Sequence, residues 1–202
     1  MDRIKTDRRV RATKLSLRTA LLSMLRELPL EKITVSALCQ RAAVGRGTFY
    51  THYRDCADLL GQLESELYAQ LRELLEQYRS NSPAMRETLV RIVECIGKNA
   101  DLCSVLLSEN GDRRFVSRVL DLACSELPSG APVSTADSRV DKSDARVSTA
   151  DSRTDPVNAR YEIRFVVCGA VGVIRAWIAS GLREEPARIA GLLWRLSRAE
   201  SR

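Results

Sequence analysis

The segment Thr34–Tyr53, with the sequence TVSALCQRAAVGRGTFYTHY, constrains the fold more than any other part of the chain. Thr34 is a favourable helix N-cap, because its hydroxyl can accept a hydrogen bond from a free amide in the first turn. The apolar residues that follow recur at helical spacing on one face: Val35, Leu38 and Ala42. Ala43–Gly45 then predicts a tight turn, in which Gly45 supplies backbone freedom. The first half of the segment therefore predicts a short helix that ends in a turn.

The second half of the segment predicts another short helix, Arg46–Tyr53. Phe49 and Tyr53 are four residues apart, so both lie on one face and can pack inward. Arginine and threonine can reach base edges in a DNA groove, whereas tyrosine and histidine can reach phosphates. Residues of these types are the ones that the pattern directs outward: Arg46, Thr48, Tyr50, Thr51 and His52. The whole segment therefore predicts a helix-turn-helix.

At these residues the chain resembles a known family. Ile33–Leu60 is similar to the DNA-binding end of the TetR/AcrR (tetracycline-repressor) transcriptional regulators, and the specific part is the run Gly47–Tyr53, GTFYTHY. The usual pattern of that family has glycine in the turn, serine at the cap of the recognition helix and lysine as a phosphate contact. Here those three positions are occupied, in that order, by Ala43, Gly45 and Cys56.

The resemblance implies a homodimer whose two recognition helices enter successive major grooves of an inverted-repeat operator in double-stranded DNA. It also implies a small-molecule inducer that binds in the body and releases the protein from DNA. Carried over by position, five residues face bases: Ser36, Arg46, Gly47, Thr48 and Thr51. Three others hold phosphate: Thr34, Tyr50 and His52. Among all of these, Arg46 is the best candidate to read a guanine.

Positive charge is concentrated on the same part of the chain. Residues 1–54 hold 12 Lys and Arg against 4 Asp and Glu, a net charge of +8, whereas residues 55–202 hold 20 against 22, a net charge of −2. Such segregation is expected of a DNA-binding head on a near-neutral effector body. The basic arm Met1–Lys14 either lies along phosphates or a minor groove, or is a solvated tail. With Cys56 in the lysine position, contact with the DNA backbone depends more on this arm.

Helical periodicity continues beyond the helix-turn-helix. Five apolar residues at helical spacing predict a first long helix closed by Pro29: Leu17, Leu21, Met24, Leu25 and Leu28. A second long helix, capped by Asp55 and running to about Arg79, can link head to body. We therefore predict an all-α fold. Its helix-turn-helix head, with the basic arm, is the DNA-binding domain at residues 1–54, and a helical effector-binding and dimerisation domain follows at residues 55–202.

Two closing helices are expected over Arg160–Arg198, with Gly181 ending the first and Pro186 in the first turn of the second. Small and aromatic residues share one face of the first helix and permit close approach of another helix: Tyr161, Phe165, Cys168, Gly169, Gly172 and Ala176. Apolar faces this wide indicate a homodimer built from paired helices. Trp177 and Trp194 belong either to that interface or to the core of one subunit.

Between these regions, residues 128–158 contain few large apolar side chains and two copies of the sequence VSTADSR, beginning at Val133 and Val147. A single pair of copies does not indicate a repeat architecture. The segment has too little apolar surface to offset the entropy of ordering, so we expect a flexible loop.

Nothing in the sequence favours an enzyme. The one histidine, His52, lies in the helix-turn-helix, so no catalytic triad can be built around it, and no dinucleotide or phosphate-loop fingerprint is present. The cysteines lack metal-ligand spacing and suit small buried residues in a reducing cytosol. A thiol sensor at Cys103, Cys124 or Cys168 is a weaker alternative. Without a signal peptide or a membrane-spanning run, we expect a cytoplasmic protein that needs no cofactor or metal.

The sequence thus predicts a sequence-specific DNA-binding transcriptional regulator, foremost a ligand-responsive homodimeric repressor that a small molecule releases from its operator. An alternative function belongs to another class. The chain could be a co-regulator or protein-interaction module of the same fold whose head does not bind DNA, and Gly45 and Cys56 keep that alternative open.

Overall fold

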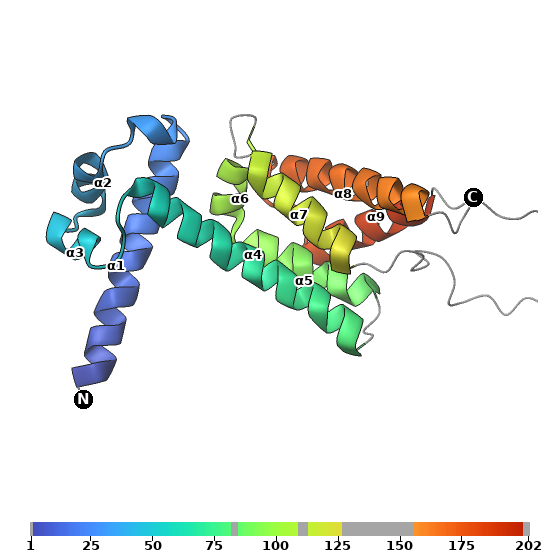
Figure 1. Ribbon diagram of the computed structural model, residues 1–202, viewed down its shortest axis with the longest axis horizontal. Coiled ribbons are helices and arrows are strands. Elements are labelled where there is room, and N and C mark those ends of the chain that lie inside the picture. Colours follow the sequence, from blue (N-terminus) through green and yellow to red (C-terminus); the bar gives the residue numbers. More distant parts are fainter. Residues whose placement is uncertain (1, 82–84, 109–112, 127–155, 200–202) are drawn as a thin grey trace, which may run out of the picture. The chain divides into compact units, whose positions relative to one another are not determined.

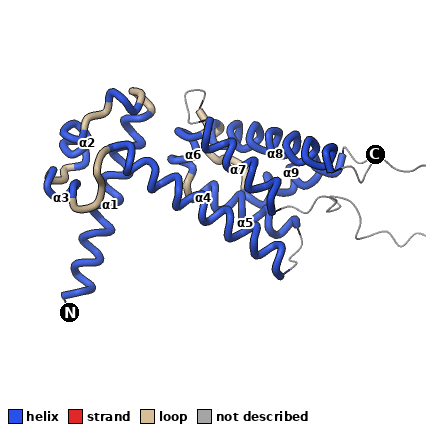
Figure 2. Tube along the Cα trace, viewed as in Figure 1, coloured by secondary structure: helices blue, strands red, loops and turns tan. Residues whose placement is uncertain are grey.

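A computed structural model describes residues 2–81, 85–108, 113–126 and 156–199 of the chain. All regular structure in these four ranges is helical, as Figure 2 shows, and the predicted all-α class is confirmed. None of the helices described is both long enough and apolar enough to cross a membrane. Most of the predicted loop 128–158 lies outside the described residues, but its last three residues are helical and open α8 (Pro156–Ala179).

The chain divides into two compact units that do not coincide with the predicted domains at 1–54 and 55–202. The first unit combines Met1–Gln70 with Asn99–Asp112, and the second combines Leu71–Lys98 with Arg113–Arg202. The long helix α4 (Cys56–Asn81) therefore contributes its first turns to one unit and its last turns to the other. The predicted linking helix is thus shared between the units rather than belonging to the body alone.

The first unit is built from short helices packed around α1, and those that precede α4 are drawn in blue to cyan in Figure 1. Its elements besides α4 are α1 (Asp2–Leu25), the 3₁₀ turn η1 (Leu30–Lys32), α2 (Val35–Ala42), α3 (Arg46–Tyr50) and α6 (Ala100–Leu106). Helix α1 packs against both α2 and α6, and α2 packs against α3. Fully buried side chains from different helices form its core: Leu17, Leu21, Leu38, Phe49, Leu59 and Leu102.

Helix α1 differs from the prediction at both ends. It begins at Asp2, so the predicted basic arm is helical and forms one continuous helix with the apolar stripe. It ends at Leu25, before the end of the predicted stripe, and Leu28 is 41% exposed. Pro29 closes the region as predicted, because it sits in extended backbone as the N-cap of η1.

The second unit packs helices around α8 and α9. Its elements besides the end of α4 are α5 (Met85–Lys98), α7 (Arg113–Glu126), α8 and α9 (Pro186–Ala199). Helix α9 packs against α5 and α8, and α7 packs against α8. Trp177 lies in the core of this unit and is only 3% exposed. Its indole N–H donates to the carbonyl of Glu184 at 2.9 Å, which resolves its two predicted roles in favour of the core.

The connection between α8 and α9 follows the predicted chemistry. Gly181 has a left-handed φ of 80°, and the amide of Leu182 donates to the carbonyl of Trp177 at 3.1 Å. This hydrogen bond closes a Schellman motif, for which glycine is the favoured residue. Helix α9 then begins at Pro186, where the lack of a proline amide costs nothing because the first helical amides have no partner within the helix.

Candidate nucleic-acid interface

The first helix of the helix-turn-helix, α2, begins as the sequence predicts. Thr34 is its N-cap in extended backbone, and the hydroxyl of Thr34 accepts a hydrogen bond from the amide of Ala37 at 3.2 Å. Since the hydroxyl only accepts in this contact, its own proton is free to be donated to a phosphate oxygen. Ser36 is exposed in the first turn of the same helix.

The turn that follows α2 is made by a different residue from the one predicted. Ala43, not Gly45, has left-handed backbone, with φ 52° and ψ 40°. The amide of Val44 donates to the carbonyl of Cys39 at 3.0 Å, and the amide of Ala43 donates to that of Gln40 at 3.3 Å, so α2 ends in a Schellman motif. Gly45 has extended backbone (φ −66°) that any residue adopts, so the prediction that it supplies the freedom of the turn is wrong.

Helix α3 is shorter than the predicted Arg46–Tyr53, because it ends at Tyr50. The amides of His52 and Tyr53 both donate to the carbonyl of Phe49, at 2.9 and 3.0 Å, which closes the chain into a turn after the helix. Phe49 and Tyr53 are nevertheless buried as predicted, with ring centroids 5.7 Å apart. The inward face of the helix-turn-helix is thus a small aromatic core.

The predicted DNA-contacting residues lie at the start of α2 and along α3 and its following turn. Seven of them are exposed: Thr34, Ser36, Arg46, Gly47, Thr48, Tyr50 and Thr51. His52 is half-buried, with its ring edge toward Tyr53 at a centroid distance of 6.2 Å. The two helices are in contact with each other, so the structure brings these residues together on one small region of the first unit.

The polar side chains of this region differ in whether their hydrogen-bond donors are already used within the chain. Arg46 has no hydrogen-bond or ion-pair partner in the part of the chain whose side chains the structure describes. The Tyr50 ring stands edge-on to Phe49, with centroids 5.5 Å apart, and the side chain is 59% exposed. The hydroxyl of Thr51, in contrast, donates to the carbonyl of Thr48 at 2.6 Å. Thr51 can therefore accept a hydrogen bond or present its methyl group, but its own proton is in use.

Gly47 has no visible reason to be a glycine within the described chain. A Cβ added there would meet no heavy atom within 4 Å, and its φ is not in the left-handed region. Glycine inside a helix costs about 0.5–1 kcal/mol of stability relative to alanine. Glycine at position 47 therefore leaves no side chain on the exposed surface of α3, at a cost to the stability of the helix.

The start of α4 is capped as predicted. Cys56, which occupies the lysine position of the family pattern, cannot make the phosphate contact of that lysine. The amide of Asp58 donates to the carboxylate of Asp55 at 2.7 Å, and the amide of Arg54 donates to Asp58 at 2.9 Å. This backbone hydrogen bond holds the pKa of Asp58 below its ordinary value. Cys56 is 5% exposed, and burial, aided by the Asp55 charge, raises the pKa of its thiol. A neutral buried thiol cannot bind phosphate.

Arg54 is a candidate that the sequence reasoning missed. Its side chain is 87% exposed, and its guanidinium lies 3.6 Å from the carboxylate of Asp58 in a loose surface pair. It stands two residues before the position where the family pattern has lysine, which is the signal that could have identified it. A groove of about 650 Å³ runs beside it along α4, but three carboxylates line that groove, at Asp55, Asp58 and Glu66. Those charges repel phosphate, so the groove is not a candidate site for the DNA backbone.

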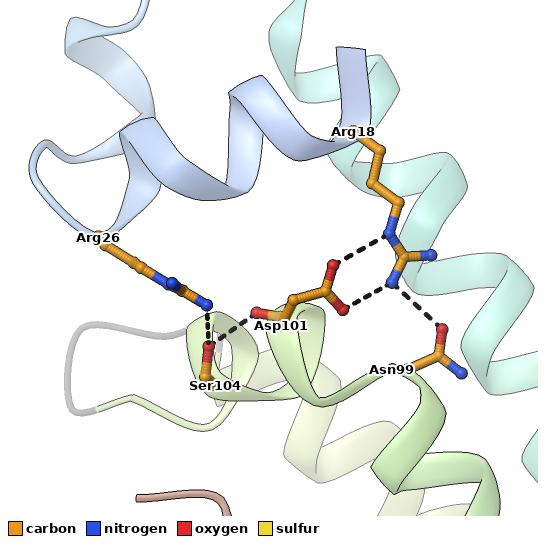
Figure 3. Close-up of polar contacts among 5 residues, drawn as sticks. All are labelled: Arg18, Arg26, Asn99, Asp101 and Ser104. Carbon is orange, nitrogen blue, oxygen red and sulfur yellow. Dashed lines mark hydrogen bonds and ion pairs between the residues drawn. The ribbon is translucent and has the colours of Figure 1, made fainter. Parts of the chain in front are cut away.

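A polar cluster joins α1 to α6 within the first unit, as Figure 3 shows. Arg18 donates from Nη2 to Asp101 at 2.8 Å and from Nε to the other carboxylate oxygen at 3.4 Å. Nη2 also donates to the side chain of Asn99 at 3.3 Å. Burial alone raises the pKa of Asp101, but hydrogen bonds from Arg18 and the backbone amide of Leu102 outweigh it, so the pKa lies below its ordinary value.

The same face of α1 carries two further residues at intervals of four. Leu22 is 2% exposed, and Arg26 donates to the hydroxyl of Ser104 at 3.5 Å (Figure 3). Leu22 is absent from the stripe that the sequence analysis assigned to α1, because it lies on a different side of the helix. Helix α1 therefore has two packing faces, one toward the helix-turn-helix core and one toward α6.

Comparison with known proteins shows which solved structures have a similar architecture. No protein-family model and no curated protein matches the sequence. A TetR transcriptional regulator from Streptococcus agalactiae 2603V is 22% identical, with a TM-score of 0.57, over 96% of this chain and 98% of that chain. SmeT, the repressor of the Stenotrophomonas maltophilia multidrug efflux pump SmeDEF, is 13% identical, with a TM-score of 0.59, over 93% of this chain and 89% of that chain.

A third similar structure is the transcriptional regulator FadR from Bacillus subtilis in complex with stearoyl-CoA. It is 15% identical, with a TM-score of 0.58, over 91% of this chain and 96% of that chain. All three similarities extend over nearly the full length of both chains, so they concern the whole architecture and not the helix-turn-helix alone. This chain therefore has the fold of the TetR-family transcriptional regulators.

Proposed function

We propose that this protein is a sequence-specific regulator of transcription that binds double-stranded DNA through α2, α3 and the turn after α3. The observation that carries the proposal is Gly47, which lies on an exposed helix face where no contact within the described chain requires glycine. A glycine that costs helix stability without an internal reason is expected where another molecule's surface approaches the backbone. A DNA groove floor is such a surface.

The neighbouring side chains fit the same partner. Arg46 is exposed and unpaired within the described side chains, so its guanidinium can donate two hydrogen bonds to O6 and N7 of a guanine. Thr48 and Thr51 can contact base edges, and the occupied proton of Thr51 favours an amino group or a thymine methyl as its partner. Tyr50, Thr34 and His52 are placed to donate to phosphate, and Ser36 and Gly47 complete the base-facing set.

We also propose that the protein is a homodimer that presents two such surfaces to an inverted-repeat operator. The support is the face of α8 on which Tyr161 and Phe165 are 69% and 66% exposed. Cys168, Gly169, Gly172 and Ala176 continue this face and are exposed too. A Cβ at either glycine would meet nothing within 4 Å, so the backbone of another helix can approach closely there. Apolar faces of this kind mark protein–protein contacts.

Response to a small molecule is the third part of the proposal. Helix α6 belongs to the first unit, whereas the helices before and after it in the chain, α5 and α7, belong to the second. A ligand that moves α5 or α7 would therefore act through the chain on α6, and through Arg18 and Asp101 on α1. The complex of FadR with stearoyl-CoA supports a small-molecule effector, and SmeT supports repression as the mode of action.

The test is selection of bound fragments from random double-stranded DNA, followed by titration of the selected operator. The wild-type protein should enrich an inverted repeat. Arg46→Ala should lose about 1–3 kcal/mol of discrimination at one base pair of each half-site, whereas Tyr50→Phe should weaken binding to all sequences alike. Enrichment of no sequence would reject DNA recognition and favour the co-regulator, which the neutral buried thiol of Cys56 and the missing side-chain cap at Gly45 support.

A further inference from the structure

We infer that the N-terminal half of α1 is a second DNA-binding surface, separate from the helix-turn-helix, in which Arg8, Arg9, Arg11 and Lys14 bind phosphates of the DNA backbone. The inference rests on the proposed function, since it takes DNA as the partner. It adds a sequence-independent contact that the surface of α2 and α3 does not contain.

The first observation is a division among the basic residues of the first unit. Four of them contact acceptors elsewhere in the unit: Arg18, Arg26, Arg41 and Arg54. Arg41, for example, donates to Glu27 at 3.2 Å and to the hydroxyl of Ser23 at 3.3 Å. The four of the N-terminal half are exposed and have no such partner among the side chains that the structure describes, and the same holds for Lys32 and Arg46. Their charges are left for a ligand.

The second observation is that this part of α1 has no buried side chain in the described chain. No side chain from Arg8 to Ser16 is buried, Leu15 is 64% exposed, and the buried side chains of α1 begin at Leu17. At a rise of about 1.5 Å per residue, Arg8 lies roughly 13 Å along the helix axis from Leu17. Figure 1 shows the N-terminal turns of α1 extending away from the other described elements of the first unit. Internal packing therefore does not account for this segment.

The third observation is that the charges oppose the helix that carries them. Arg8 and Arg11, and Arg11 and Lys14, are three residues apart, so like charges are neighbours on the helix surface and destabilise it. Lys14 and Arg18 are four apart, although Arg18 is neutralised by Asp101. A polyanion relieves this repulsion, and DNA supplies phosphates at a spacing that several long side chains can contact together.

The pattern of apolar residues separates DNA from a lipid surface as the partner. A helix that lies on a membrane needs a continuous apolar face opposite its basic face. Val10 and Leu15 are five residues apart, so they point about 140° away from each other around the helix. The four cations are likewise distributed around the helix rather than along one edge. Such an arrangement leaves no continuous apolar face of the kind that a lipid surface requires.

The experiment compares two full-length variants that each lose three positive charges. One is Arg8→Ala/Arg9→Ala/Arg11→Ala, and its matched control is Arg86→Ala/Arg91→Ala/Lys98→Ala on the exposed side of α5. Equilibrium binding to the selected operator and to a mixed-sequence duplex is measured from about 50 to 200 mM salt. The slope of log affinity against log salt should become shallower by about 0.9 for each lost phosphate contact in the first variant only.

The first variant should also bind both duplexes about tenfold or more weaker in 0.1 M salt, by the same factor for each. Its thermal unfolding temperature should equal or slightly exceed that of the wild type, because the substituted side chains are not buried and their mutual repulsion is removed. A salt slope equal to that of the control would overturn the inference. A loss confined to the operator would do so as well, since phosphate contacts carry no sequence information. If the wild type binds DNA and loses specificity with Arg46→Ala, either result leaves the proposed function intact.

Discussion

Two of the exposed surfaces described above have no partner within the described chain, and they differ in chemical character. The surface of α2 and α3 in the first unit is polar, with Arg46 unpaired among the described side chains and Gly47 open to approach. The face of α8 in the second unit is apolar and aromatic, with Phe165 66% exposed. An unpaired cation is stabilised by an anion, whereas an exposed apolar face is stabilised by contact with another apolar face. The difference is consistent with the two partners of the proposed function, DNA for the first unit and a second copy of the chain for the second.

The largest effect is expected from breaking the apolar surface. Phe165→Arg places an unpaired charge at the centre of the proposed dimer contact, which costs about 3–5 kcal/mol when the charge is buried. The dimer should dissociate at concentrations at least about a hundredfold higher than for the wild type, as measured by sedimentation equilibrium. Glu94→Gln changes the net charge by the same amount on the exposed side of α5 and should leave the dimer intact. An unchanged dimer in Phe165→Arg would place the interface elsewhere.

A second prediction concerns the cation that the chain does pair, in contrast to Arg46. Arg18→Met removes the ion pair with Asp101 and should lower the free energy of unfolding by about 1 kcal/mol, a value kept small because both groups are partly exposed. A double-mutant cycle with Asp101→Asn, read from urea unfolding, isolates the pair. Additive effects of the two substitutions would show that the pair contributes nothing.

The same pair gives stability a pH dependence with a definite sign. The pKa of Asp101 is lower in the folded protein than its ordinary value, so the unfolded chain binds the proton more readily. The stabilisation that the ion pair contributes to folding is therefore complete above the unfolded-state pKa of about 4 and is lost as the pH falls through the folded-state pKa. The Asp101→Asn variant should lack this part of the acid-dependent loss.

A third prediction sharpens the account of the polar surface, because one substitution should act in opposite directions on folding and on binding. Gly47→Ala should raise the free energy of unfolding by about 0.5–1 kcal/mol, since alanine is the better helix former and its Cβ meets nothing. The same variant should bind the selected operator more weakly. Thermal unfolding and operator titration measure the two effects. Tighter or unchanged DNA binding would remove the central argument for this surface.

The smallest effect is expected at the turn between α2 and α3. Ala43→Gly relieves an alanine held at φ 52°, which costs about 1–2 kcal/mol, but adds chain entropy to the unfolded state. A net stabilisation of about 0.5 kcal/mol should result. Gly45→Ala is the reverse substitution: its backbone is extended and its Cβ would stand 3.8 Å from the Thr48 hydroxyl, so it introduces no strain. It should stabilise the protein by about 0.4–1 kcal/mol, because alanine lowers the entropy of the unfolded chain. Loss of stability in either variant would contradict the assignment of the turn.

Local chemistry explains which features the sequence was able to predict. The cap at Thr34, the inward rings of Phe49 and Tyr53, and the helix end at Gly181 each depend on residues within a few positions of one another. The turn was misassigned because a glycine was present and the sequence suggested that it took the left-handed position. In the structure the hydrogen bonds that end α2 place Ala43 there instead. The strain at Ala43 cannot be read from residue type.

Contacts between residues far apart in the sequence could not be predicted from local sequence patterns. Arg18 and Asp101 are 83 residues apart, and neither residue is unusual in its own segment. Leu22 did not fit the single apolar stripe assigned to α1, because a second face of that helix packs against α6. The periodicity of one helix indicates that it has an apolar face, but not which helix will cover it.

The membership of α6 in the first unit has a consequence for protein engineering. The chain passes from one unit to the other at three points, after Gln70, after Lys98 and after Asp112. A chimaera that grafts a foreign head at residue 54 keeps this chain's α6 but discards the α1 surface that covers it. Such a graft would expose the partners of Leu22 and leave Asp101 without its arginine. Exchange of the proposed operator specificity therefore calls for substitutions on α3, or for a graft that moves α6 together with the head.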